Sequence, residues 1–151
     1  SSVVIKGIRK GENPELVTMW TIIGYPGTTV AMPVWVKGGC DGIPRMLLAD
    51  EKVHAPLADW GYTLKMRAYS WNIDNNPDNA KKYFNFGLLV NPYGTGYLQK
   101  VFNLEDEILP PYRASLAKWY AAGKIDVKEM KALHKAADDK VEAFYKANFE
   151  L

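Results

Sequence analysis

The sequence predicts an α+β fold in which an antiparallel sheet is followed by C-terminal helices. Two observations predict this class. The first forty residues hold three β-branched and aromatic runs separated by turn residues, and the last part of the chain repeats its apolar positions with a helical period. The length of 151 residues suits one ordinary domain.

The three expected strands span residues 2–8, 16–24 and 28–36. Short connections with turn residues, such as 25–27, favour an antiparallel meander. Successive side chains of a strand point to opposite faces, and both faces of the second and third strands are apolar. The sheet is therefore expected to be covered on both sides. Pro33 cannot donate to a ladder, which predicts a bulge or an edge position for it.

The middle of the chain alternates loops with two short elements. Residues 38–56 are rich in Gly and Pro and predict a loop, and a loose apolar stripe predicts a helix over 57–71. The polar cluster at 74–79 is typical of a surface turn. An apolar run predicts a fourth strand over 83–90, closed by turn residues at 91–96.

Helices are expected over about 98–148. Pro110 and Pro111 predict a kink or a restart, and Gly123 predicts a helix end. Asp126 is a suitable N-cap for the last helix. The apolar stripe of that helix consists of Val127, Met130, Leu133, Ala137, Val141 and Phe144.

Several polar residues are explained by structure alone. The run Glu105-Asp106-Glu107 is typical of a helix start, where acidic side chains interact favourably with the positive end of the helix dipole. Asp138 is expected on the solvated face of the last helix, and His134, beside its apolar stripe, is expected to pack.

Composition excludes several classes of protein. The 19 basic and 17 acidic side chains leave a net charge of +2, which predicts no surface for nucleic acid or anionic lipid. One cysteine forms no internal disulfide and completes no zinc site. The apolar runs are too short for a membrane span, and no residue pattern indicates a metal or a cofactor.

Three residues are candidates for catalysis. Cys40 lies in a Gly-rich loop and His54 follows fourteen residues later, so that a Cys–His pair would supply a thiolate for acyl transfer. Ser1 would act through its own α-amino group, as in N-terminal-nucleophile hydrolases. The alternative for Cys40 is a loop residue without a catalytic role. The alternative for Ser1 is a chain end produced by processing or truncation.

The tryptophans allow two interpretations. Most lie at core-facing positions, which favours packing between sheet and helices, and stacking on a carbohydrate or a nucleobase is the alternative. They are Trp20, Trp35, Trp60, Trp71 and Trp119.

Six segments carry a resemblance to a known family. They are residues 1–7, 11–14, 18–26, 30–36, 82–86 and 94–99, with Thr-Met-Trp-Thr-Ile-Ile-Gly-Tyr-Pro at 18–26 as the longest. Together they resemble the C-terminal part of a bacterial group of N-terminal-nucleophile (Ntn) hydrolases, the cysteine-dependent relatives of choloylglycine hydrolase, penicillin V acylase and penicillin acyltransferase.

The resemblance implies that residues 1–151 are a single C-terminal portion of a larger four-layer αββα sandwich. It implies hydrolysis of a linear amide (C–N) bond in a small molecule, or transfer of its acyl group, by an N-terminal cysteine upstream of Ser1. Ser1 and Cys40 match no nucleophile segment of the family. Trp20, Tyr25 and Trp35 would form part of the substrate pocket wall.

The implied partner is the N-terminal part of the same protein, covalently continuous or as a separate subunit. The implied location is periplasmic or secreted, and assembly into a homo-oligomer stays open. Two other functions also stay open: a non-catalytic ligand- or partner-binding domain of a secreted bacterial protein, and a Cys40–His54 thiol hydrolase.

Overall fold

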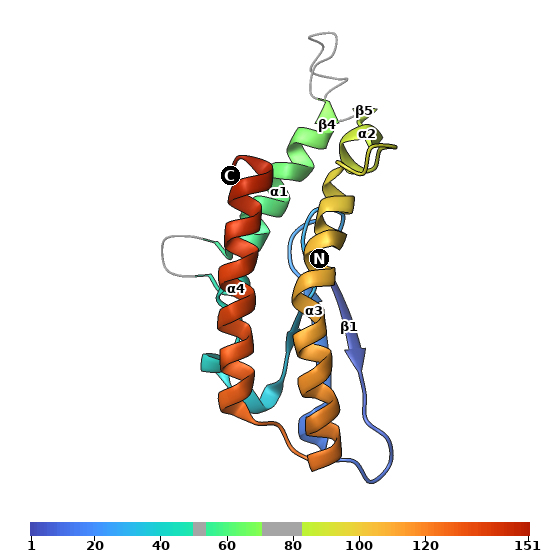
Figure 1. Cartoon of the computed structure of the whole chain (residues 1–151). Coiled ribbons are helices and arrows are strands. Elements are labelled where there is room, and N and C mark those ends of the chain that lie inside the picture. The colour runs from blue at the N-terminus through green and yellow to red at the C-terminus, as the bar shows by residue number, and fades with distance from the viewer. Residues whose placement is uncertain (50–53, 71–82) are drawn as a thin grey trace.

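The computed structural model describes residues 1–49, 54–70 and 83–151, and it confirms the α+β class (Figure 1). A three-stranded antiparallel sheet has the order β1-β2-β3. Its strands are β1 (Ser2–Lys6), β2 (Thr18–Ile22) and β3 (Met32–Val34). The predicted meander is therefore confirmed.

The third strand is shorter than predicted. Thr28 and Thr29 lie before it and turn their hydroxyls onto the carbonyl of Tyr25, so this part of the run forms a turn. Pro33 lies in β3, which among the described residues pairs only with β2. The edge position expected for this proline is confirmed.

The next helix, α1 (Pro56–Ala68), agrees with the prediction for 57–71 apart from its end. It leads into β4 (Tyr69–Ser70), which pairs with β5 (Tyr83–Phe84). Trp71 and the predicted turn at 74–79 lie outside the described residues.

The predicted strand over 83–90 is wrong after its first two residues. The two-residue ladder ends at Phe84, and the chain then forms the short helix α2 (Phe86–Leu89), in which Val90 N donates to Phe86 O over 2.8 Å. A short apolar run suits a strand or a helical turn equally well, and without a partner strand the helical turn supplies the backbone hydrogen bonds. The turn expected at 91–96 follows, where Asn91 Oδ1 accepts from the amide nitrogens of Tyr93 and Thr95.

Two long helices form the C-terminal part and run side by side in Figure 1: α3 (Tyr97–Ala122) and α4 (Val127–Phe149). Gly123 ends α3 in the left-handed conformation with φ 67°. The Asp126 carboxylate caps α4 by accepting from Lys128 N and Glu129 N over 2.9 and 3.0 Å. Both predicted helix boundaries are confirmed.

The helix does not restart at Pro110 and Pro111, which was one of the two predicted alternatives, because α3 continues through both residues. Both prolines are solvent exposed, so water can solvate the two carbonyl groups that lose an amide partner. The opposite face of the same turns buries Ile108 and Tyr112, which are 3% and 1% exposed. The burial of these two side chains offsets the two missing backbone hydrogen bonds.

The acidic run at 105–107 does not start a helix, as was expected, but lies in the middle of α3. Glu105 is half-buried there, and its Oε1 accepts from Ala31 N over 2.8 Å. Burial raises the pKa of the Glu105 carboxyl. This side chain therefore ties α3 to the chain just before β3.

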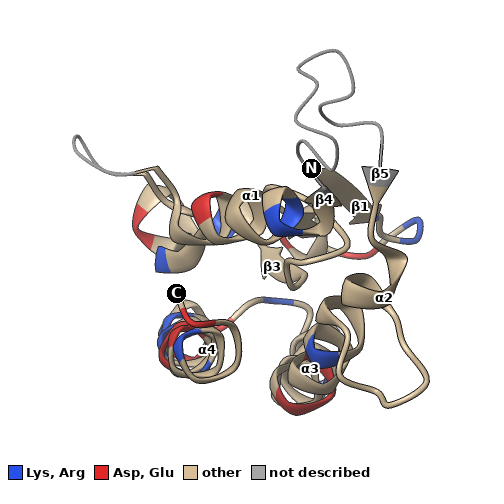
Figure 2. Ribbon diagram, turned by 90° about the horizontal axis from the view of Figure 1, so that it is seen from above, with Lys and Arg blue, Asp and Glu red and all other residues tan. Residues whose placement is uncertain are grey.

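The helices cover one end of the sheet on both sides. Figure 2 shows α1 on one side of β3 and the pair α3 and α4 on the other. Short 3-10 turns complete the core layer, namely η1 (Pro14–Leu16), η2 (Val36–Gly38), η3 (Cys40–Gly42) and η4 (Arg45–Leu47). The largest fully buried side chains include Trp35, Tyr112, Tyr145, Leu16, Met32, Met46, Leu57, Leu64, Leu104 and Met130.

This cover does not reach the other edge of the sheet. All five residues of β1 are exposed, and Val3, Val4 and Ile5 keep 51%, 63% and 65% of their surface accessible. Within residues 1–151, the predicted cover on both sides is therefore present at β3, between α1 and the C-terminal helices, whereas β1 stays exposed.

Candidate functional site

The turn between β2 and β3 is held by three hydrogen bonds to one carbonyl group. Tyr25 O accepts from Thr28 N over 2.9 Å, from the Thr28 hydroxyl over 3.2 Å and from the Thr29 hydroxyl over 2.9 Å. Both threonines are buried, at 0% and 1% exposed. Tyr145 of α4 adds a further bond from its hydroxyl to Thr28 O over 2.7 Å. The position of Tyr25 is therefore fixed from the interior of the protein.

Two glycines let this turn approach α1 closely. A Cβ at Gly61 would lie 2.5 Å from Cγ2 of Thr29 and 3.2 Å from the amide nitrogen of Tyr25. Gly24 adopts φ +86°, and a Cβ there would lie 3.2 Å from the backbone of α1 at Ala58. Larger residues at either position would push the turn away from the helix.

A shallow pocket of about 280 Å³ lies where the turn meets α1. Its lining residues are Ser1, Gly24, Tyr25, Pro26, Tyr62 and Lys65. The Lys65 ammonium lies 5.7 Å from the ring centroids of both Tyr25 and Tyr69, within the range of a cation–π contact. The pocket therefore has aromatic walls and one positive side chain, and none of its lining residues is acidic.

The three expected pocket-wall residues lie in different places. Tyr25 lines this pocket together with Ser1. Trp20 is half-buried on β2 and packs against the core. Trp35 is 1% exposed, and its Nε1 donates to Thr18 Oγ1 over 2.8 Å, so it belongs to the interior. The structure thus brings together Ser1 and Tyr25 in one pocket. Trp35 lies in the core and does not line this pocket.

The expected catalytic pair is not assembled in the described part of the chain. Cys40 is exposed at the start of η3. The His54 side chain is 87% exposed, and its Nδ1 lies 3.1 Å from Asp59 Oδ1 on α1. No hydrogen bond joins the thiol to the imidazole among the described residues, so His54 serves as a partner of Asp59.

A buried polar cluster lies between β3, α3 and α4, around His134. The imidazole stacks on Trp35 at a centroid distance of 5.6 Å, and its Nδ1 lies 2.8 Å from the Tyr112 hydroxyl. Burial lowers the pKa of His134 to about 4 and raises the pKa of Tyr112. Both groups are neutral at pH 7, which confirms the packed histidine predicted from the sequence.

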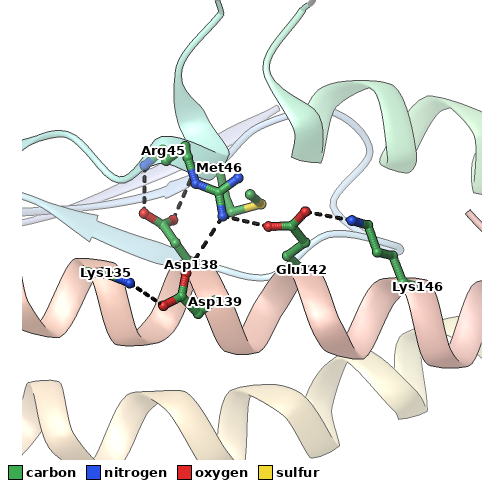
Figure 3. A network of polar contacts seen from close by, with 7 residues as sticks. All are labelled: Arg45, Met46, Lys135, Asp138, Asp139, Glu142 and Lys146. Atoms are coloured by element: carbon green, nitrogen blue, oxygen red, sulfur yellow. Dashed lines mark hydrogen bonds and ion pairs between the residues drawn. The ribbon is translucent and has the colours of Figure 1, made fainter.

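Asp138 does not lie on the solvated face of α4, where it was expected, but is 5% exposed. Its carboxylate accepts from Arg45 N over 2.8 Å and from Met46 N over 3.1 Å (Figure 3). Arg45 also pairs with Glu142 over 2.6 Å. The backbone amides of η4 replace the water that a carboxylate on a helix surface would otherwise bind.

Comparisons with protein-family models, curated proteins and solved structures found no match for this chain. Within the described ranges, no group of His, Cys, Asp and Glu side chains is arranged to hold a metal ion. The described helices include none with the length and apolar character needed to cross a membrane.

The sequence indicated Tyr25 and Ser1 of this pocket but not the other residues that line or support it. Thr28 and Thr29 were assigned to a strand, and no signal distinguishes a strand threonine from one that bonds a nearby carbonyl. The spacing of Tyr62 and Lys65 could have indicated that they share a surface, because residues three apart lie on the same side of a helix.

Proposed function

We propose that this chain is the scaffold part of a hydrolase or acyltransferase that acts on linear amide C–N bonds. The nucleophilic cysteine belongs to a segment outside these 151 residues. The resemblance of six segments to cysteine-dependent Ntn hydrolases supports the reaction class. The arrangement of the sheet supports the role of this chain as a part of a larger sheet.

The observation that carries the proposal is the open edge at β1, which within the described ranges pairs with β2 alone. Val3 and Ile5 project from one face of this strand and Val4 from the other, and all three are more than half exposed. An unpaired apolar edge strand is a template for a further strand, and natural proteins protect such edges. In the proposed protein, a strand of the nucleophile-bearing part pairs with β1 and continues the sheet.

The proposed reaction proceeds in two steps. The thiolate of the N-terminal cysteine attacks the amide carbonyl carbon, the C–N bond breaks, and the leaving amine takes a proton from the cysteine's own α-ammonium group. Water then attacks the thioester, its proton passes to the α-amino group, and the cysteine sulfur leaves as the thiolate, which restores the starting thiolate and α-ammonium group. An acceptor amine in place of water gives acyl transfer.

The experiment begins with the natural protein isolated from its source. Intact mass spectrometry and sequencing of every N-terminus are expected to reveal a chain that begins with cysteine. Hydrolysis of a panel of N-acyl amines is then followed by amine release, and iodoacetamide is expected to abolish it. A Cys40→Ser variant is the matched control and should keep full activity, because the proposal assigns the nucleophile to another cysteine and Cys40 lies exposed on η3.

Three outcomes contradict the proposal. The absence of an N-terminal cysteine together with the absence of amine release would leave β1 as the docking edge of a non-catalytic binding domain. Loss of turnover in Cys40→Ser would instead identify Cys40 as the nucleophile. An enzyme whose turnover resists iodoacetamide would not be a thiol hydrolase.

A further inference from the structure

The pocket between the Tyr25 turn and α1 has the features of a built binding site. The backbone of Tyr25 is held by buried threonine hydroxyls and by the close approach of Gly61, so the point from which its ring projects is fixed before any ligand arrives. Tyr62 lines the pocket from the exposed surface of α1, and 61% of the surface of this tyrosine is accessible.

The charge in this pocket has one sign. Several lysines of the chain pair with carboxylates: Lys37, Lys118, Lys135, Lys140 and Lys146. Among the residues that the structure describes, Lys65 makes no ion pair and contacts the aromatic faces of Tyr25 and Tyr69 instead. A cation held only by aromatic rings keeps its capacity to bind an anion.

We propose that this pocket binds a small aromatic carboxylic acid. Lys65 pairs with the carboxylate, and the rings of Tyr25 and Tyr62 contact the aromatic ring of the ligand. A volume of about 280 Å³ suits a molecule with one ring and a short acid chain. The inference does not rest on the proposed function, because residues of this chain alone supply the contacts.

The test uses the natural protein and 3-phenylpropionate as the probe, with binding followed by calorimetric titration. We expect saturable binding in the millimolar range or tighter. Lys65→Met should weaken it about fivefold, and Lys65→Arg should restore most of the affinity. Tyr62→Ala should weaken it about threefold through loss of ring contact.

Matched controls separate the pocket from other sites in the protein. Lys10→Met and Tyr93→Ala remove an exposed lysine and an exposed tyrosine elsewhere and should leave the affinity unchanged. 2-Phenylethylamine, which carries the opposite charge, should bind much more weakly than the acid. The inference is overturned by undetectable binding of the acid, by equal binding of the amine, or by an affinity that neither Lys65→Met nor Tyr62→Ala changes.

Discussion

The environment of His134 shows how burial alone determines the charge of a side chain. The residue is 4% exposed, packs on Trp35 and meets the Tyr112 hydroxyl. Burial removes water from the cationic form of the imidazole, and this loss of hydration is the cause of the lowered pKa of His134. The folded protein therefore holds a neutral imidazole well below the pH at which an exposed histidine becomes charged.

This pKa predicts a loss of stability in mild acid. The folded pKa of about 4 lies below the ordinary histidine value of 6.5, so the unfolded chain takes up the proton first as pH falls. The contribution of His134 is complete above about pH 6.5 and is lost as pH falls toward 4. Replacing the residue by glutamine, which keeps a polar group beside Tyr112, should reduce the acid-induced loss of unfolding free energy between pH 7 and 4 by about 3 kcal/mol.

Urea denaturation of both proteins at each pH measures this difference. Asp138 and Glu105 act in the opposite direction, because burial raises the pKa of each and acid favours their folded protonated forms. Their contribution cancels in the comparison, since both proteins contain them. Equal acid sensitivity of the two proteins would show that His134 is not the titrating group.

At the scale of elements, one carboxylate joins η4 to α4. Asp138→Asn keeps the size of the side chain but presents an amide NH₂ where one of two backbone N–H groups needs an acceptor. We expect a loss of about 1–3 kcal/mol in unfolding free energy. Hydrogen exchange should also accelerate at the amides of Arg45 and Met46.

The neighbouring residue supplies the control for that prediction. Asp139 is exposed and pairs with Lys135 over 2.6 Å at the helix surface. Asp139→Asn should therefore change the unfolding free energy by less than about 0.5 kcal/mol. A cost as large as that of Asp138→Asn would mean that surface charge, and not the buried contact, holds the two elements together.

The prolines of α3 predict a gain in stability on substitution. Pro110→Ala restores an amide donor for the carbonyl one turn earlier and removes the ring that opposes it, on a face that is exposed to solvent. Thermal and urea unfolding should show a stabilisation of about 1–3 kcal/mol. Ala114→Gly on the exposed face of the same helix should instead cost about 1 kcal/mol, and a loss on Pro110→Ala would indicate that the helix depends on the proline.

At the scale of the whole molecule, the sheet is covered at one edge and open at the other. Val4 projects from β1 with 63% of its surface accessible, whereas Met32 on β3 is completely buried. If a further strand covers β1 in the natural protein, a cysteine in place of Val4 will react slowly with a maleimide. We expect it to react at least about tenfold more slowly than Val36→Cys, whose position is 93% exposed.

Both variants are made in a Cys40→Ser background, and labelling is read by peptide mass spectrometry so that other thiols do not interfere. Equal labelling rates would show that β1 stays open in the natural protein. That result would remove the structural support for a sheet continued by another segment.

The predictable part of the fold consists of features that depend on neighbours in sequence. The Asp126 cap, the Gly123 helix end and the apolar stripe of α4 follow from hydrogen bonds and periodicity within a few residues. The meander followed from short turns between β-rich runs. Of the residues that line the candidate site, the sequence indicated Tyr25 as a pocket-wall residue and Ser1 as a catalytic candidate.

The remaining features depend on contacts between residues far apart in the chain. The continuity of α3 through Pro110 depends on burial against other elements, and the burial of Asp138 depends on amides more than ninety residues earlier. The pocket forms only where the Tyr25 turn meets α1. Local hydrogen bonds and periodicity therefore specify the α+β class, the meander and the helix ends, and these could be predicted. The open β1 edge and the approach of Lys65 to Tyr25 follow only from the folded chain, because the packing of distant segments determines which surfaces meet.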